Sequence, residues 1–260
     1  MNTLVIGARG SVGQLVLDGL IARGVPVRAS ARRPEPGQFR VDLTEPATLI
    51  PAFDGVEQVF LYANRESVPD VLEAARETGV RRIVLLSSGS VLHPTSAGNP
   101  ITEEHRAIED AFAAAPDLTV IPIRPLVLAT NALPWTRPGP VALYRPEART
   151  APIHERDIAA VAVAALTGDD DTTGILTGPV RLSQRDQVAA IRPDATVNAL
   201  TRTEGLAHFS RFMPAPEAEA VLRFLDDAAA GNSLATDTVE RILGRPALSF
   251  DTWVADHTAS

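Results

Sequence analysis

The sequence contains neither cysteine nor lysine among its 260 residues. Without cysteine there are no disulfides, thiolate nucleophiles, iron–sulfur clusters or cysteine-bound zinc sites. All 24 basic residues are arginine, so the chain can form no Schiff base and no lysine-assisted proton relay. A formal net charge of −8 opposes binding to the phosphate backbone of nucleic acids.

Long apolar runs are also missing. No stretch approaches the ~18–20 apolar residues that a membrane span needs, and residues 1–6 leave no room for a signal peptide. We therefore expect a cytoplasmic protein that binds neither membrane nor nucleic acid and whose partner is a small hydrophobic molecule; the oligomeric state stays open. Four isolated histidines show no ligand spacing, so no metal site is predicted. Asp169, Asp170 and Asp171 are expected to form a solvated loop.

The first half of the chain alternates short apolar runs with segments of helical period. Strands are expected over residues 3–6, 25–30, 58–61, 82–86 and 118–123. Helices are expected over residues 11–24, 43–55, 68–79 and 102–116, the last with Thr102 as its N-cap. This alternation is typical of βαβ units and predicts an α/β fold with a Rossmann-type doubly wound parallel sheet.

The alternation stops after residue 125. A proline-rich stretch, residues 131–153, is expected to be a substrate lid made of loops and at most short strands. A helix over residues 155–166 and a strand within residues 174–178 return to the sheet. We therefore expect a Rossmann core of residues 1–130 completed by 154–182, and a small, mainly helical substrate-binding subdomain of residues 183–260.

The segment "GARGSVG" places three glycines between an apolar strand and an apolar helix. This is the setting in which backbone N–H groups at a helix N-terminus hold a pyrophosphate. Gly7 would allow the tight turn, Gly10 close approach to phosphate, and Gly13 close packing of helix on sheet. The loop residues expected to bind a dinucleotide are Gly7, Arg9, Gly10, Ser11, Val12 and Gly13.

The end of the second strand, "VRASARRPE", indicates which dinucleotide binds. NAD-binding proteins place an acid there for the ribose 2′-hydroxyl, whereas NADP-binding proteins place arginine near the 2′-phosphate. Here no acid occurs before Glu35, and Arg32 and Arg33 stand in the phosphate position, with Arg9 able to close from the glycine loop. The pattern favours NADPH/NADP+ as the cofactor. The alternative is that Arg32 and Arg33 are ordinary exposed charges.

Several motifs are spread over nearly the whole chain. They include the glycine loop, "VRASARRPE", "VPDVLEAARETGVRRIVLLSS", "IRP", "RDIAAVAVAAL", "ILTGP" and "GRPALSFDTWVADH". Together they resemble the NmrA-like branch of the atypical short-chain dehydrogenase/reductase family. The resemblance implies cofactor contacts by Asp42 and Leu43 at the adenine, Tyr62, Ala63 and Asn64 at the ribose, Ser87 and Ser88 at the nicotinamide end, and Pro125.

The family's usual catalytic set is incomplete in this chain. Ordinary members of the superfamily use Ser, Tyr and Lys, but the corresponding helix reads "EEHRAIED" and places His105 and Glu109 at the Tyr and Lys spacing. The expected serine aligns with Gly89, which leaves Ser88 or Ser90 as substitutes. Ser88 and His105 are the candidate catalytic residues. Glu109 is expected to orient the His105 ring and raise its pKa, although an exposed pair without catalytic role is the alternative.

Two functional classes follow from these observations. In the first, the protein is an NADPH-dependent reductase of a ketone or quinone, with the proton coming from water, a substrate hydroxyl, a serine or His105. In the second, it is a non-catalytic NADP(H)-binding sensor of the NmrA type. An apolar lid favours the enzyme and a flat aromatic substrate such as a polyketide. The lid residues are Leu126, Val127, Leu128, Leu133, Pro134, Trp135, Val141 and Leu143.

Overall fold

The computed structural model describes residues 2–168 and 171–258. Asp169 and Asp170, two residues of the predicted solvated loop, lie outside the described residues. Contacts within the chain divide it into two compact units. The first unit comprises residues 1–88, 104–124 and 155–174, and the second comprises residues 89–103, 125–154 and 175–260.

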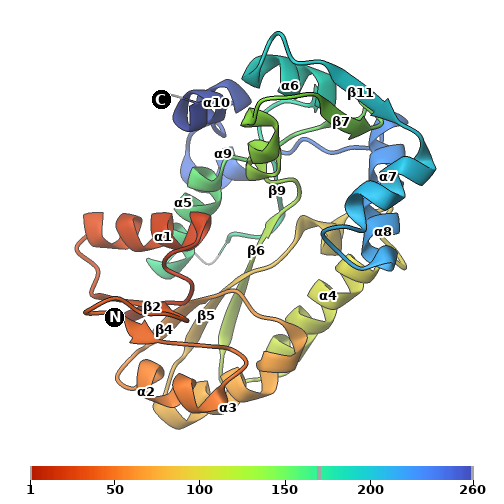
Figure 1. The fold of residues 1–260 in the computed structure, drawn as a ribbon. Helices are drawn as coiled ribbons and strands as arrows, with labels where there is room; N and C mark the ends of the chain where they lie inside the picture. Colours follow the sequence, from red (N-terminus) through yellow and green to blue (C-terminus); the bar gives the residue numbers. More distant parts are fainter. Residues whose placement is uncertain (1, 169–170, 259–260) are drawn as a thin grey trace. The chain divides into compact units, whose positions relative to one another are not determined.

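A parallel sheet forms the centre of the first unit (Figure 1). Within this unit the strands lie in the order β3-β2-β1-β4-β5-β6, and every neighbouring pair among these six is parallel. Because β1 lies between β2 and β4, the strand order reverses at β1. In parallel sheets of this kind, ligands bind outside the carboxyl ends of the strands that flank such a reversal. The strands are β1 (Thr3–Val5), β2 (Val27–Ala31), β3 (Phe39–Arg40), β4 (Gln58–Leu61), β5 (Arg82–Leu86) and β6 (Thr119–Pro125).

Helices cover both faces of this sheet (Figure 1). One face carries α1 (Ser11–Ala22) and α5 (Glu155–Leu166), which pack against each other. The other face carries α2 (Leu49–Phe53), α3 (Val68–Thr78) and α4 (Pro100–Ala113), with Ile108 and Phe112 of α4 in one core cluster with Leu49 and Phe53 of α2. The predicted doubly wound parallel sheet is confirmed.

Two of the predicted helices differ in detail. The helix expected over residues 43–55 is a 3₁₀ turn, η1 (Pro46–Thr48), followed by the short α2. The helix expected to begin at a Thr102 N-cap begins at Pro100, and Asn99 Oδ1 accepts hydrogen bonds from the backbone N–H groups of residues 101 and 102, at 2.9 and 3.3 Å. The Thr102 prediction is wrong because Asn-Pro is itself a strong start signal, with proline suited to the first helical position.

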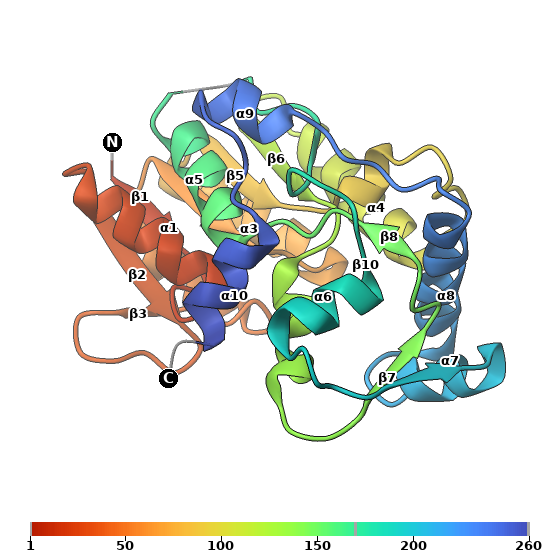
Figure 2. The same cartoon turned by 90° about the horizontal axis from the view of Figure 1, so that it is seen from above.

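The second unit contains short strand pairs and most of the remaining helices (Figure 2). β7 pairs with β11 in parallel, β8 pairs with β10 antiparallel, and α7 packs against α8. The elements of this unit are η3 (Gly89–Leu92), η4 (Ala129–Thr136), β7 (Val141–Tyr144), β8 (Arg149–Thr150), β9 (Ile175–Leu176), β10 (Leu182–Ser183), α6 (Gln184–Ile191), β11 (Val197–Leu200), α7 (Arg202–Phe209), α8 (Ala215–Ala229), α9 (Thr238–Leu243) and α10 (Phe250–Thr258).

The stretch predicted as a lid contains core residues of the second unit. Val141 and Leu143 of β7 are buried against Val188 of α6, and Trp135 packs on the same cluster. Leu133, in contrast, keeps 41% of its surface exposed. Only part of the apolar content of residues 131–153 is therefore free to contact a substrate. Within the described chain, no helix combines the length and the apolarity that crossing a bilayer requires.

Candidate functional site

The glycine loop joins the end of β1 to the start of α1. Gly7 adopts φ +75°, a left-handed conformation that disfavours other residues. A Cβ atom at Gly13 would lie 2.2 Å from the Gly7 carbonyl oxygen, so no larger side chain fits while α1 keeps this position. A Cβ at Gly10 would lie 3.3 Å from the same oxygen. The three glycines thus form a tight loop in which backbone rather than side chains faces the helix start.

The N-terminus of α1 has the properties of an anion site. Gly10 is the extended N-cap residue, no side chain caps the helix, and the first turn carries no acid. The backbone N–H groups of the first turn have no partner inside the helix, and they lie at the positive end of its dipole. Loop and helix start therefore fit the pyrophosphate of a dinucleotide.

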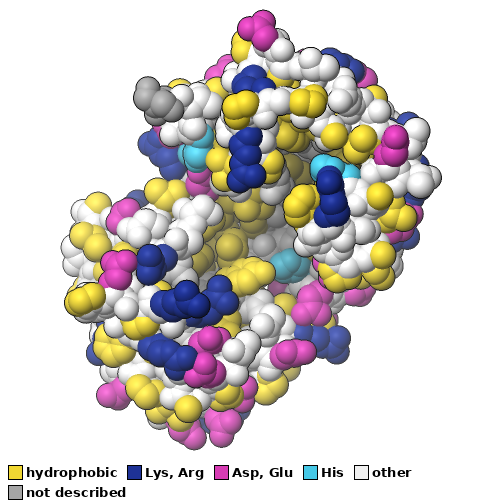
Figure 3. All heavy atoms as spheres, in the orientation of Figure 1, with side chains coloured by type: hydrophobic (Ala, Val, Ile, Leu, Met, Phe, Trp, Pro, Cys, Tyr) yellow, Lys and Arg dark blue, Asp and Glu magenta, His cyan; other side chains and the backbone are white. Residues whose placement is uncertain are grey.

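Arginine side chains gather near the end of β2. Arg32 and Arg33 are exposed, and within residues 2–168 and 171–258 neither guanidinium has an ion-pair partner. Arg9 reaches across from the glycine loop, where its Nη1 donates to the Arg33 carbonyl at 3.3 Å and its Nη2 lies 3.4 Å from Glu35. In Figure 3, arginine side chains cover the part of the first unit that Figure 1 labels β2 and β4. The arrangement can bind a phosphate group beside this strand end.

Asp42 and Leu43 follow β3. Asp42 Oδ1 accepts hydrogen bonds from Thr44 Oγ1 at 2.7 Å and Thr44 N at 3.0 Å. These bonds lower the pKa of Asp42, and the charges of Arg32 and Arg40 lower it further. Leu43 is half-buried and packs on the core cluster of the first unit. The contact of both residues with adenine stays a prediction.

The residues after β4 lie at the same carboxyl edge of the sheet. Tyr62 is 59% exposed, whereas Ala63 is buried. Asn64 caps a 3₁₀ turn, η2 (Arg65–Ser67), because its Oδ1 accepts from the Ser67 backbone N–H at 2.8 Å. Tyr62 and Asn64 are therefore the two exposed residues of the three, and the Asn64 Oδ1 is already used in the turn.

A buried network links β5, β6 and α4. Ser87 Oγ donates to Glu109 Oε1 at 2.5 Å, and Arg124 donates to the same carboxylate through Nε at 2.9 Å and Nη2 at 2.6 Å. Arg124 was not among the residues predicted for the site. An available signal was its place inside "IPIRP", where a charged residue interrupts an apolar strand and requires a partner.

His105 and Glu109 share one face of α4, but they are not a hydrogen-bonded pair. Glu109 bonds Ser87 and Arg124, and no described group forms a hydrogen bond with the His105 ring. Burial lowers the pKa of His105, and the opposing charges of Glu109 and Glu104 do not compensate. Glu109 does raise the pKa of His105, as expected, but desolvation of the ring outweighs this effect and the net pKa is lowered. The expectation that Glu109 orients the ring is wrong, because its carboxylate bonds Ser87 and Arg124 instead.

The two candidate serines follow β5 in different surroundings. Ser88 is half-buried and comes directly after Ser87, whereas Ser90 lies in η3 and lines a cavity of the second unit. Pro125 is buried at the end of β6. Ser88 and Pro125 thus both stand at carboxyl ends of strands, where a parallel sheet presents its ligand-binding edge.

Comparison with known proteins identifies the family. Residues 7–169 match the protein family described as NAD(P)H-binding. The chain belongs to this NAD(P)H-binding family. The (4-alkanoyl-5-oxo-2,5-dihydrofuran-3-yl)methyl phosphate reductase of Streptomyces griseus subsp. griseus is 35% identical over 98% of this chain and 97% of its own. The NAD(P)H azoreductase of Xenophilus azovorans is 30% identical over 99% of this chain and 98% of its own.

Solved structures share the fold of this NAD(P)H-binding protein. The NADPH-dependent quinone oxidoreductase of Escherichia coli, complexed with NADPH, aligns with a TM-score of 0.78 at 19% identity, covering 98% of this chain and 99% of its own. The triphenylmethane reductase of Citrobacter sp., complexed with NADP(H), aligns with a TM-score of 0.78 at 18% identity, covering 99% and 100%. The prediction of a nicotinamide dinucleotide as cofactor is confirmed by the family, whose matched region contains the glycine loop, the arginines and the β4–β6 strand ends.

Proposed function

We propose that this chain is an NADPH-dependent reductase of a ketone or quinone carbonyl carried by a hydrophobic substrate. Membership of the NAD(P)H-binding family supports the cofactor, and the names of both curated relatives support reduction as the reaction. When bound, the cofactor supplies a hydride. An aromatic polyketide is the substrate class that we infer from the exposed or half-buried apolar residues among positions 126–134. The chain resembles, in type, the angucyclinone ketoreductase of simocyclinone biosynthesis, which also lacks the Tyr-Lys pair.

The preference for NADPH over NADH rests on the arginines. Arg32 and Arg33 carry guanidinium groups free of ion pairs among the described residues, and Arg9 reaches toward them. Guanidinium groups bind phosphate through two donors at once, so the 2′-phosphate gains contacts that the 2′-hydroxyl of NADH cannot make. We assign the cofactor part to residues 1–130 with 154–182 and the substrate part to residues 183–260, with residues 131–153 as the substrate-facing lid.

The proposed mechanism depends on the contacts that Glu109 makes with Arg124 and Ser87. At the position where related enzymes hold lysine, the Glu109 carboxylate is paired with Arg124 and hydrogen-bonded to Ser87, and a carboxylate cannot supply the positive charge that lysine provides there. Hydride addition to the carbonyl carbon breaks the carbonyl π bond and leaves an alkoxide that needs one proton. We propose that this proton comes from His105, Ser88, a substrate hydroxyl or water. Positioning supplies most of the rate, since orientation alone can lower a barrier by roughly 7–11 kcal/mol.

The deciding experiment follows NADPH oxidation with a panel of aromatic ketones and quinones. Nicotinamide-deuterated NADPH should place deuterium on the carbinol carbon of a reduced ketone, which separates enzymatic hydride transfer from background oxidation. Turnover with label transfer supports the reductase. Tight NADPH binding without turnover of any panel member would instead support the sensor function.

A further inference from the structure

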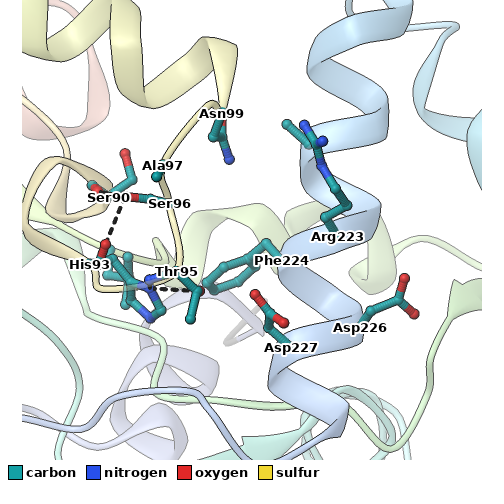
Figure 4. A pocket seen from close by; sticks show the side chains of 12 residues that line it. Ser90, His93, Thr95, Ser96, Ala97, Asn99, Arg223, Phe224, Asp226 and Asp227 are labelled. Atoms are coloured by element: carbon teal, nitrogen blue, oxygen red, sulfur yellow. Dashed lines mark hydrogen bonds between the residues drawn. The ribbon is translucent and has the colours of Figure 1, made fainter.

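The second unit contains a cavity of about 240 Å³ between two chain segments. One wall consists of residues 90–99, which follow Ser88 in the chain, and the other is α8 (Figure 4). Phe224 gives the cavity an apolar surface, while His93, Asn99, Arg223 and Asp227 give it polar groups. The hydrogen-bonding state of these four side chains indicates what kind of ligand the cavity fits.

His93 is buried and carries a donor without an acceptor. Its side chain is 5% exposed, and its Nδ1 receives the Thr95 backbone N–H at 3.4 Å and lies 3.2 Å from Thr95 Oγ1. Because a backbone N–H only donates, Nδ1 is the acceptor, and the neutral ring carries its proton on Nε2. His93 Nε2 is buried and bonds no other described group. An unsatisfied buried donor is destabilising, and an oxygen acceptor on a ligand would remove this cost.

Arg223 and Asn99 provide further donors. Arg223 is exposed, and among the described residues its guanidinium has no ion pair. Asn99 uses its Oδ1 for the first N–H groups of α4, which leaves its amide NH₂ for the cavity. Figure 4 draws Asn99 and Arg223 reaching in from opposite walls, away from the end where His93 and Asp227 lie.

The two carboxylates that line the cavity, Asp226 and Asp227, differ in their hydrogen-bond and ion-pair partners. Asp226 accepts from Tyr144 Oη at 2.8 Å, from Arg145 Nε at 2.6 Å and from Arg202 Nη1 at 2.6 Å, so its charge is neutralised. Asp227 has no such partner in the described chain, and its charge acts on His93 to raise a pKa that burial lowers. An anion is therefore disfavoured near Asp227 and favoured beside Arg223 and Asn99.

We propose that this cavity binds an oxyanion, a phosphate monoester or a carboxylate, that is carried by the carbonyl substrate. Arg223 and Asn99 donate to the oxyanion, His93 Nε2 donates to an uncharged oxygen of the same molecule, and Phe224 contacts its hydrocarbon part. The inference rests on the proposed reductase function and defines its substrate class as charged at one end and hydrophobic in its body.

Three matched ketones test the proposal with the full chain. 4-Acetylphenyl phosphate, 4-acetylbenzoate and acetophenone share one aromatic ketone and differ in charged group. Binding is measured without NADPH, by calorimetry and by the ring ¹⁵N resonances of His93 in histidine-labelled protein. We expect at least one charged ketone to bind tenfold or more tightly than acetophenone and to shift the His93 Nε2 resonance; the two charged arms distinguish phosphate from carboxylate.

Substitution of Arg223 gives the decisive comparison. Arg223→Gln should reduce the preference for the charged ketone over acetophenone at least tenfold, and Arg223→Lys should restore part of it. Arg76→Gln, at an exposed arginine of α3, is the matched control and should leave the preference unchanged. Equal binding of charged and neutral ketones, or a preference that Arg223→Gln does not alter, would overturn the proposal.

The outcome is separable from that of the reductase proposal. If the charged ketone binds in an Arg223-dependent manner but no ketone oxidises NADPH, the oxyanion site stands and the reductase function is wrong. If acetophenone is reduced but the charged ketones bind no better than it does, the reductase stands and the oxyanion site is refuted.

Discussion

Glu109 of α4 and Arg124 of β6 form a two-point ion pair, with Nε to Oε1 at 2.9 Å and Nη2 to Oε2 at 2.6 Å. Both side chains are mostly buried, with 11% and 14% of their surfaces exposed. The pair ties α4 to the sheet and also fixes the Ser87 hydroxyl, which bonds the same carboxylate. In this chain, which has no lysine, Glu109 thus serves as a structural anchor for α4, the helix that carries His105.

Breaking this ion pair should destabilise the protein. We expect Arg124→Met to lower the free energy of unfolding by about 3–5 kcal/mol, because a buried carboxylate is left without its counter-charge. Urea denaturation followed by circular dichroism measures the change. The double variant Glu109→Leu with Arg124→Met removes both charges and should be more stable than Arg124→Met alone. A loss below ~1 kcal/mol in the single variant would show that the pair is not an anchor.

A second prediction concerns Gly13. An alanine Cβ would lie 2.2 Å from the Gly7 carbonyl oxygen and 2.8 Å from its carbon, so α1 must move away from the loop. We expect Gly13→Ala to cost about 1–3 kcal/mol of stability and to raise the NADPH dissociation constant at least tenfold. Gly19→Ala in the same helix is the control, since the nearest atoms that its Cβ would meet are side-chain atoms of Val163, at 3.0 Å, and Arg23, at 3.8 Å, and not the backbone of the glycine loop. NADPH affinity equal in both variants would contradict the role given to the loop.

A third prediction separates NADPH from NADH. Arg32→Ala removes a guanidinium that would contact only the 2′-phosphate, so NADPH binding should weaken by tenfold or more while NADH binding changes little. Fluorescence titration with each cofactor gives the two dissociation constants. Arg76→Gln again serves as the control for loss of one surface charge. Equal weakening of both cofactors would remove Arg32 from the phosphate site.

The sequence alone was sufficient to predict the bounds of an element where the whole signal lies within that element and its flanking residues. Strand β4 and helix α5 have the predicted bounds: β4 follows the turn residues Asp54 and Gly55, and α5 begins at an acid and is followed by Thr167 and Gly168. Strand β3 was missed, since two residues, Phe39 and Arg40, carry no alternation to detect. The start of α4 was misplaced because Thr102 resembles a cap, while Asn99 three residues earlier makes the actual hydrogen bonds.

The candidate site likewise contains features that depend on local sequence and features that depend on tertiary packing. The glycine loop lies in one short segment, so its geometry follows from spacing, whereas the partner of Glu109 lies on another element and depends on the packing of α4 on the sheet. Desolvation of His105 likewise depends on tertiary neighbours, so the sign of its pKa shift was not accessible from the i, i+4 spacing. The burial of His93 could not be predicted from the sequence either, because it also depends on tertiary neighbours.

The last prediction tests His105 as the proton donor. A donor must be protonated, and burial lowers the pKa of His105 below its ordinary value of about 6.5. If His105 supplies the proton, kcat/KM for ketone reduction should therefore fall as pH rises, with a midpoint below about 6.5. His105→Gln should abolish this pH dependence and lower the rate at acid pH. Glu104→Gln removes a charge that raises the same pKa, so it should move the midpoint to still lower pH. An unchanged profile in His105→Gln would instead assign the proton to water, a serine or the substrate hydroxyl, because the ring would then have no part in the protonation step.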